Sequence, residues 1–107
     1  MEKSMLLETI GDSIENRILD FLIEGRGLDY SKKDIAEGCG ISRPTVYAVL
    51  PRMIKQCTIK STRAIGRIQL YTLNESNAKV KIILKLDEML LKNSFEEVGK
   101  GKLKIPV

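Results

Sequence analysis

Residues 34–50 read DIAEGCGISRPTVYAVL, and this stretch determines the fold expected for the chain. Its apolar residues recur as they do on two short helices that meet at a corner. Gly40 lies between the helices, where the turn needs a positive φ angle, and Ala36 is small enough for the second helix to cross close to it. The remaining apolar side chains are expected to fill the inside of the corner: Ile35, Cys39, Ile41, Val46 and Val49.

Polar residues mark where both helices begin. Ser31 and Asp34 have the spacing of a capping box, which predicts the start of the first helix. Ser42 is expected to cap the second helix by accepting a hydrogen bond from the amide of Thr45, since Pro44 in the second position has no N–H to donate. Two helices joined by such a turn form a helix-turn-helix motif, whose second helix lies in the major groove of DNA. An αα-hairpin without a role in DNA binding is the alternative.

Upstream of this motif the sequence predicts a further helix and a short arm. Asp12 and Glu15 have capping-box spacing, and apolar residues then repeat at helical intervals until Gly25 ends the helix. Residues 5–10 form an apolar arm of one or two helical turns before it. Residues 28–30, between this helix and the motif, have the pattern of a short strand.

The second helix of the motif contains a proline. The apolar spacing carries this helix to about Gln56, across Pro51. A proline inside a helix removes the hydrogen bond to the carbonyl four residues earlier, here that of Tyr47. The helix therefore either bends at this point or ends at Leu50 and restarts.

A β-hairpin and a long helix complete the chain. Two strands are expected within residues 58–73, the first ending at Ser61 and the second beginning at Ile68, with a turn at 64–67. One long helix is expected over 77–98. The inward side chains of the hairpin should be those of Ile59, Tyr71 and Leu73.

Length and composition limit the organisation of the chain. The 107 residues suffice for one domain, which we expect to span 1–98 as a mostly α fold with a small β-hairpin (α+β), followed by a flexible basic tail over 99–107. Two cysteines do not make a disulfide framework. No signal peptide is evident, and no apolar run approaches the roughly 18 residues that cross a bilayer. We therefore expect a cytoplasmic chain without a membrane partner.

Charge is unevenly distributed along the chain. The net charge is −4 over residues 1–30, +6 over 31–73 and +2 over 74–107. A generic solvated surface would mix both signs throughout. The positive charge of the central segment, residues 31–73, is most simply explained by a polyanionic partner.

Four segments carry a resemblance to a known class of protein: NRILDFL (16–22), DIA (34–36), GISRPTVY (40–47) and GRIQLYTL (66–73). On these residues, the stretch from about Glu15 to Leu73 resembles winged helix-turn-helix transcriptional regulators, particularly archaeal ones. The hairpin at 58–73 would be the wing. The resemblance implies sequence-specific binding of double-stranded DNA. Cys57 stands where such proteins usually place a glycine.

The second helix of the motif would present its non-apolar side to DNA. Arg43 can make a bidentate contact with guanine O6 and N7, and Tyr47 can reach a base edge, a thymine methyl or a phosphate. Helix N-termini can hold phosphate, and Arg63 and Arg67 are expected to bracket the tip of the wing. The predicted DNA-binding residues are Lys32, Lys33, Ser42, Arg43, Pro44, Thr45, Tyr47, Arg52, Lys60, Arg63 and Arg67.

The long helix has more apolar faces than one core can cover. At about 100° per residue, a first stripe that can cover the core consists of Val80, Leu84, Leu91 and Phe95. A second, roughly opposite stripe is expected to form a homodimer interface. Its residues are Ile82, Ile83, Leu86, Met89 and Leu90. The alternative is that the apolar arm at residues 5–10 covers the second stripe within one chain.

Other classes of function find little support in the residues. The chain has no histidine, no cysteine cluster, no glycine-rich phosphate loop and no nucleophile elbow, so neither an enzyme nor a metal or organic cofactor is expected. No small-molecule effector is evident. Two alternatives remain open, a winged-helix protein-interaction module within a larger assembly and a plasmid or viral replication or partition protein that binds DNA.

Overall fold

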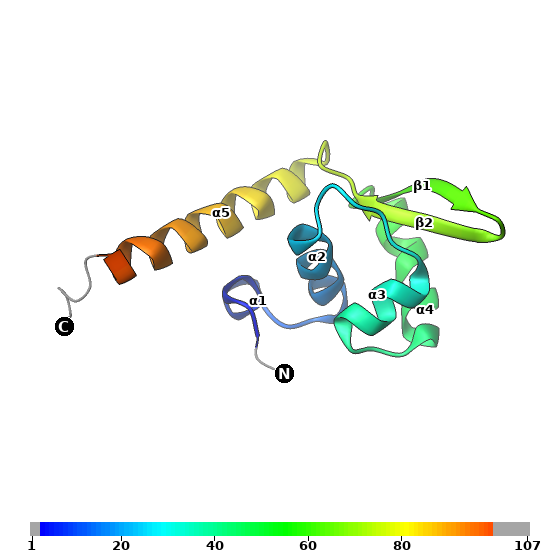
Figure 1. Ribbon diagram of the computed structural model, residues 1–107, viewed down its shortest axis with the longest axis horizontal. Coiled ribbons are helices and arrows are strands. Elements are labelled where there is room, and N and C mark those ends of the chain that lie inside the picture. Colours follow the sequence, from blue (N-terminus) through cyan, green and yellow to red (C-terminus); the bar gives the residue numbers. More distant parts are fainter. Residues whose placement is uncertain (1–2, 100–107) are drawn as a thin grey trace.

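Helices make up most of the structure, and one β-hairpin projects from them (Figure 1). The computed structural model describes residues 3–99. The elements are α1 (Met5–Ile10), α2 (Ile14–Glu24), α3 (Lys32–Cys39), α4 (Arg43–Lys55), β1 (Ile59–Ile65), β2 (Ile68–Leu73) and α5 (Ala78–Gly99). This order confirms the mostly α fold with a small hairpin and a long C-terminal helix. The predicted tail lies, from residue 100 on, outside the described residues.

A serine precedes each of the first four helices and caps it. Each side-chain oxygen accepts a hydrogen bond of 3.0–3.2 Å from the amide three residues later, in Ser4, Ser13, Ser31 and Ser42. The predicted capping box of α3 is complete, because Asp34 also accepts a bond from the amide of Ser31. The helix predicted after Asp12 is present as α2, but the cap predicted for it is wrong, since Ser13 is its cap. Asp12 instead pairs with Arg17, whose Nη2 donates to its carboxylate at 3.0 Å.

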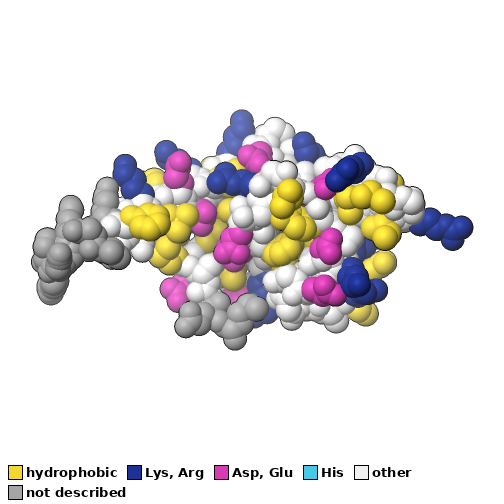
Figure 2. Space-filling model, viewed as in Figure 1, with side chains coloured by type: hydrophobic (Ala, Val, Ile, Leu, Met, Phe, Trp, Pro, Cys, Tyr) yellow, Lys and Arg dark blue, Asp and Glu magenta, His cyan; other side chains and the backbone are white. Residues whose placement is uncertain are grey.

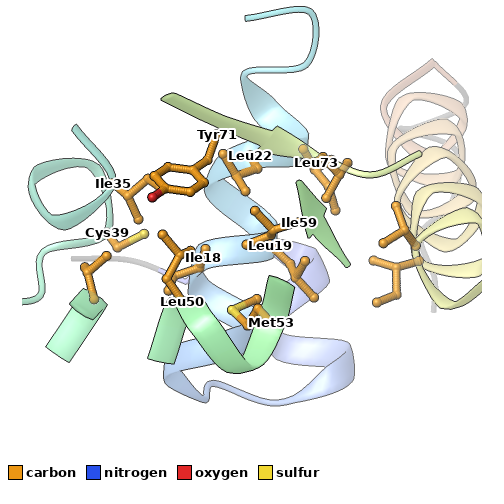
Figure 3. Close-up of a cluster of buried hydrophobic side chains, with 14 of the residues drawn as sticks. Ile18, Leu19, Leu22, Ile35, Cys39, Leu50, Met53, Ile59, Tyr71 and Leu73 are labelled. Atoms are coloured by element: carbon orange, nitrogen blue, oxygen red, sulfur yellow. The ribbon is translucent and has the colours of Figure 1, made fainter. Parts of the chain in front are cut away.

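The hydrophobic core forms around α2 (Figure 3). Ile18, Leu19 and Leu22 of this helix are at most 1% exposed. The same cluster takes in side chains from α1, α3, α4, both strands and α5. The inward positions predicted for the hairpin are confirmed, because the buried residues include Ile59, Tyr71 and Leu73.

The turn between α3 and α4 has the predicted geometry. Gly40 has a φ of 68°, in the left-handed region that favours glycine. The amide of Ile41 donates to the carbonyl of Ala36 at 3.0 Å and so closes the end of α3. The helix-turn-helix corner predicted from residues 34–50 is therefore present.

The connection from α4 to β1 turns at Cys57. α4 runs without interruption through Pro51, so the alternative of a helix that ends at Leu50 is wrong. Cys57 then has a φ of 65° and is the one non-glycine residue with positive φ in the described part of the chain. Its side chain is exposed. A cysteine thus adopts the backbone conformation of the glycine that the resemblance leads one to expect.

β1 is longer than predicted, and the turn at the tip of the hairpin is tighter. β1 runs to Ile65, β2 begins at Ile68 as predicted, and these two residues pair. The turn therefore consists of Gly66 and Arg67 alone. Arg63, which was expected to bracket the tip, lies within β1.

β1 also contains a β-bulge. The register shifts between Ser61 and Ala64, so that Thr62 and Arg63 together face the single residue Leu70 of β2. Neighbouring side chains of a regular strand point to opposite faces, whereas a bulge re-aims them. The bulge can therefore turn two consecutive side chains toward one partner.

Residues 28–30 lie along β2, on the edge opposite β1. Tyr30 and Tyr71 exchange two backbone hydrogen bonds of 2.8 Å, and Oγ1 of Thr72 donates to the carbonyl of Leu28 at 3.0 Å. The strand predicted here is reduced to a single bridge. This bridge attaches the segment that enters α3 to the hairpin.

α5 begins at a joint with the end of α4. The side chain of Asn74 donates to the carbonyl of Cys57 at 2.8 Å, and the backbone N–H of Asn74 donates to the carbonyl of Thr58 at 2.9 Å. The side chain of Asn77 donates to the carbonyl of Gln56 at 3.3 Å, while its own Oδ1 caps the first turn of α5. Two asparagines thus hold the C-terminus of α4 against the N-terminus of α5.

α5 packs on α1 before it leaves the body of the molecule (Figure 1). Val80 and Ile83 are 1% and 8% exposed and belong to the same cluster as Leu6 of α1. Leu86 and Leu90 are partly buried against this cluster. Part of the second stripe is therefore buried within the protomer beside α1, but the alternative in which the N-terminal arm covers this stripe is wrong for Ile82 and Met89, which are exposed.

α5 also carries large apolar side chains that the other described residues leave exposed. Ile82 (70% exposed) and Met89 (51%) lie on one side of the helix, and we call these two the α5 apolar surface, while Leu91 (44%) and Phe95 (74%) lie on the roughly opposite side. Figure 2 shows hydrophobic side chains gathered on the C-terminal half of this helix. The prediction that the first stripe covers the core is wrong for Leu91 and Phe95, because α5 extends past the elements that could bury them (Figure 1).

Candidate nucleic-acid interface

The exposed side of α4 presents the residues predicted to read DNA. Arg43, Pro44 and Tyr47 are exposed, and Ala48 extends the same face. The opposite face is buried in the core and consists of Val46, Leu50 and Met53. Burial of this apolar face sets the rotation of α4 and turns Arg43, Pro44 and Tyr47 outward, as expected for the side that would face DNA.

Two hydroxyl groups lie at the N-terminus of α4. Oγ of Ser42 and Oγ1 of Thr45 are 2.7 Å apart, and Ser42 is exposed while Thr45 is half-buried. A helix N-terminus with hydroxyl groups suits a phosphate. Phosphate contacts by these two residues stay a prediction.

The two lysines at the start of α3 have different surroundings. Lys33 is exposed. Nζ of Lys32 instead lies 4.3 Å from the centre of the Tyr47 ring and 5.8 Å from the centre of the Tyr71 ring. Both distances fall within the range of a cation–π interaction. Lys32 therefore links α3 to α4 and to the hairpin.

Two arginines predicted to bind DNA form ion pairs within the chain. Nε of Arg52 donates to Glu15 of α2 at 2.7 Å, and Nε of Arg63 donates to Asp29 at 3.0 Å. Both arginine side chains remain more than half exposed. The structure thus pairs these two guanidinium groups with acidic partners of the same chain.

Asp29 holds the wing through the bulge of β1. Its carboxylate accepts a hydrogen bond of 2.7 Å from Oγ1 of Thr62 and bonds of 3.0 and 3.3 Å from the Arg63 guanidinium. The guanidinium holds the pKa of Asp29 below its usual range, and the Thr62 bond lowers it further. Asp29 therefore stays ionised at neutral pH and ties the hairpin to the segment that enters α3.

The tip of the hairpin combines a cation with apolar side chains. Arg67 is exposed in the two-residue turn, and Ile65 and Ile68 on either side of it are each 57% exposed. Dark blue side chains stand out at this end of the molecule in Figure 2. The two isoleucines were not among the residues predicted to bind DNA.

The central segment keeps several basic side chains that are free to meet a polyanion. Within residues 3–99, those that are exposed and make no ion pair are Lys33, Arg43, Lys55, Lys60 and Arg67. Four of these five were predicted to bind DNA, and Lys55 was not. Its position in the last turn of α4 gave no signal in the sequence beyond its charge.

Sequence reasoning missed two residues that shape the wing. Asp29 meets Arg63, which follows 34 residues later, and Nε2 of Gln69 donates to the carbonyls of Arg63 and Leu70 at 2.8 and 3.2 Å. These bonds close the bulge. No local pattern announces a bulge or a contact of such sequence separation, so the sequence alone held no signal for either residue.

Three titratable side chains in and beside the core are not among the residues predicted to bind DNA. Burial raises the pKa of the Cys39 thiol to about 11, which keeps it protonated and unreactive. Burial also raises the pKa of Asp20 and of Glu24 on α2, and Asp87 of α5 raises both further. Oγ of Ser4 donates to Asp20 at 3.0 Å.

No group of three or more histidine, cysteine or acidic residues within 3–99 is arranged to hold a metal ion. None of the helices in the same range is both long enough and apolar enough to cross a membrane.

Comparisons with protein-family models and with curated proteins gave no match to this sequence, whereas solved structures do match. A mutant of MepR from Staphylococcus aureus, bound to an oligodeoxyribonucleotide, has a TM-score of 0.62 at 16% sequence identity, covering 90% of this chain and 70% of that chain. NadR in complex with 4-hydroxyphenylacetate has a TM-score of 0.62 at 22% identity, covering 87% and 67%.

The fold is a winged helix-turn-helix. α3 and α4 are its helix-turn-helix, and β1 and β2 are its wing. TubR, a protein of type III plasmid segregation, shares this winged-helix fold with a TM-score of 0.57 at 26% identity, covering 80% of this chain and 90% of that chain. MepR is described as a transcription regulator of the multidrug efflux pump MepA.

Proposed function

We propose that this winged-helix chain binds double-stranded DNA sequence-specifically as a homodimer and regulates transcription. The observation that carries the proposal is the exposed face of α4. Burial of the opposite, apolar face of this helix turns it outward, beside a wing that has an arginine at its tip. Its fold is shared with a DNA-bound structure of MepR, which supports the same reading. A small-molecule effector is not part of the proposal, and the archaeal type of the resemblance stays a prediction.

In this proposal α4 is the recognition helix. Arg43 contacts guanine in the major groove, and Tyr47 lies one turn further along the same face. Arg67 at the wing tip enters the minor groove or clamps a phosphate. Lys33 and Lys60 contact the backbone on either side, so base readout and phosphate contacts come from different elements.

The salt dependence of affinity tests this assignment of charge. If about four of the five exposed, unpaired basic residues of each chain touch phosphate, a dimer neutralises roughly eight charges. The logarithm of the association constant should then fall with the logarithm of salt concentration with a slope of about −7. A slope shallower than about −2 would show that the basic segment is not the binding face.

Substitutions on two adjacent elements test the readout. Arg43→Ala should relax the preference at one base pair of each half-site, because it removes a contact worth roughly 1–3 kcal/mol of discrimination. Lys33→Ala should weaken binding to all sequences alike. Selection of bound duplexes from a random pool measures both, and an Arg43 variant that keeps the full base preference would refute the assignment.

We propose the α5 apolar surface as the centre of the homodimer interface. Its two residues, Ile82 and Met89, were predicted to lie in this interface and are exposed, while Leu91 and Phe95 lie on the roughly opposite side of α5. Ile83 is already buried within the protomer. A two-fold partner would cover the exposed side chains on both copies at once.

Sedimentation equilibrium of two variants tests the interface. Met89→Glu places an unpaired carboxylate in an apolar contact, which costs several kcal/mol and should raise the dimer dissociation constant by about 100-fold or more. Lys79→Glu alters charge at an exposed position outside this surface and should leave the dimer intact. A wild-type chain that sediments as a monomer at high concentration would refute the dimer. It would also remove the reason to expect inverted half-sites about 10 base pairs apart.

The likeness to TubR favours one second candidate, a DNA-binding protein of plasmid segregation. Selection of bound fragments from genomic DNA distinguishes the two roles. A regulator should enrich single inverted repeats near promoters, and a segregation protein should enrich arrays of repeated sites. A protein-interaction module should show no affinity for duplex DNA.

A further inference from the structure

We propose that Lys32 is a positioning residue that orients Tyr47 for reading DNA, and that it does not itself contact phosphate. This inference rests on the proposed function of the α4 face. The sequence placed Lys32 among the residues that bind DNA directly, and the inference changes that role.

The position of the Lys32 ammonium carries the inference. Nζ lies 4.3 Å from the centre of the Tyr47 ring and 5.8 Å from that of Tyr71. Tyr71 is 7% exposed and is fixed by its backbone bonds to Tyr30. Tyr47 is 57% exposed and belongs to the recognition face. The ammonium therefore lies close to both a buried ring of the wing and an exposed ring of α4.

Local electrostatics do not explain a lysine at this point of the chain. Lys32 is the first residue of α3, where the partial positive charge of a helix N-terminus disfavours a cation. The two ring faces offset this disadvantage, because the electron-rich face of an aromatic ring attracts an ammonium within about 6 Å. Lys33, the next residue, has no such ring contact among the described residues and points into solvent.

Restraining Tyr47 has a consequence for recognition. An unrestrained tyrosine on a helix surface loses side-chain freedom when it docks against bases, which weakens binding. With the ammonium over one ring face, Tyr47 keeps its other face and its hydroxyl available to DNA in a fixed orientation. Lys32 should therefore contribute to base preference and contribute little to salt dependence.

NMR of the free protein tests the contact without DNA. The ε-methylene protons of Lys32 should be shifted upfield by the ring current, whereas those of Lys33 should have the values of a solvated lysine. Tyr47→Leu should remove most of the shift. A Lys32 resonance indistinguishable from that of Lys33 in the wild type would overturn the inference.

Binding by three variants tests the role. Lys32→Met should lower affinity for the selected operator by about three-fold for each half-site, or about ten-fold for two, and have a smaller effect on random duplex. Lys32→Arg should retain affinity, because a guanidinium also stacks on aromatic rings. Lys33→Met, the matched control, should weaken both duplexes equally and flatten the salt slope by about one per chain.

Two results on DNA would overturn the inference. One is a Lys32→Met variant that behaves as Lys33→Met does, with equal losses on both duplexes and a flatter salt slope. The other is an effect of Lys32→Met that persists unchanged in the Tyr47→Leu background. A wild-type chain without duplex affinity would instead refute the proposed function, and the upfield shift, which needs no DNA, keeps the two failures distinguishable.

Discussion

Replacing Cys57 by glycine should stabilise the protein, although it removes a side chain. At a φ of 65° an L-residue is strained by about 1–2 kcal/mol, because its Cβ crowds the following carbonyl oxygen. Glycine avoids this strain, and its greater freedom in the unfolded chain costs about 0.4–1 kcal/mol. The exposed thiol makes only a weak contact, 3.8 Å from the Lys55 carbonyl. The net stabilisation should be about 0.5–1 kcal/mol.

Thermal unfolding followed by circular dichroism, at one fixed protein concentration, measures the effect. For a domain of this size the Tm of Cys57→Gly should rise by about 3–6 °C. Cys57→Ala keeps the strain and should leave the Tm within about 2 °C of the wild type. Gly40→Ala is the reverse experiment. At a φ of 68°, with no atom within 4 Å of the added Cβ, it should lower stability by about 1 kcal/mol through backbone strain alone.

Two outcomes would refute this reasoning. A lower Tm for Cys57→Gly would show that the side chain stabilises the turn by more than the strain destabilises it. An equal rise for Cys57→Ala and Cys57→Gly would assign the effect to loss of the thiol, since alanine relieves none of the backbone strain.

Three further predictions concern the wing, the acidic groups and the thiols. Asp29→Asn should accelerate hydrogen exchange of the wing amides and leave that of the α2 amides unchanged. Because the pKa of Asp29 is lowered in the folded state, protonation of Asp29 in the wild type should loosen the wing in the same way as the pH falls below about 4. The pKa of Asp20 is raised, so the folded state holds its carboxyl proton more tightly than the unfolded chain does. The free energy of unfolding should therefore decline as the pH rises above about 4. Urea unfolding should show a shallower decline of this free energy with pH in Asp20→Asn. Cys57→Ser should bind DNA as the wild type does under both oxidising and reducing conditions, and an oxidant-dependent loss that disappears in the variant would contradict this.

The helix-turn-helix could be predicted from sequence because the interactions that define it are local. Ser31 and Asp34 cap α3 across three residues, and Ser42 caps α4 in the same way. Gly40 needs no distant partner to turn the chain. The outward face of α4 followed as well, since burial of one apolar face fixes the direction of the other.

Contacts between distant residues could not be predicted in this way. The ion pairs of Arg52 and Arg63 depend on how α2 and residues 28–30 pack against α4 and the wing. The position of Lys32 over Tyr47 likewise depends on the angle between two helices. For α5, periodicity indicated apolar stripes correctly, but which of them is buried depends on where the body of the molecule ends, and helical spacing carries no information on that.

The joint made by Asn74 and Asn77 gives α5 the properties of a lever. Since these side chains bond to the carbonyls at the end of α4, the two helices cannot slide past each other without breaking those bonds. The 22 residues of α5 span about 33 Å, so a rotation of about 6° around its C-terminal end displaces the joint by about 3.5 Å. That displacement is close to one base-pair step of about 3.4 Å along the duplex. In the proposed dimer, the crossing angle of the two α5 helices would therefore set which operator spacing both recognition helices can reach together.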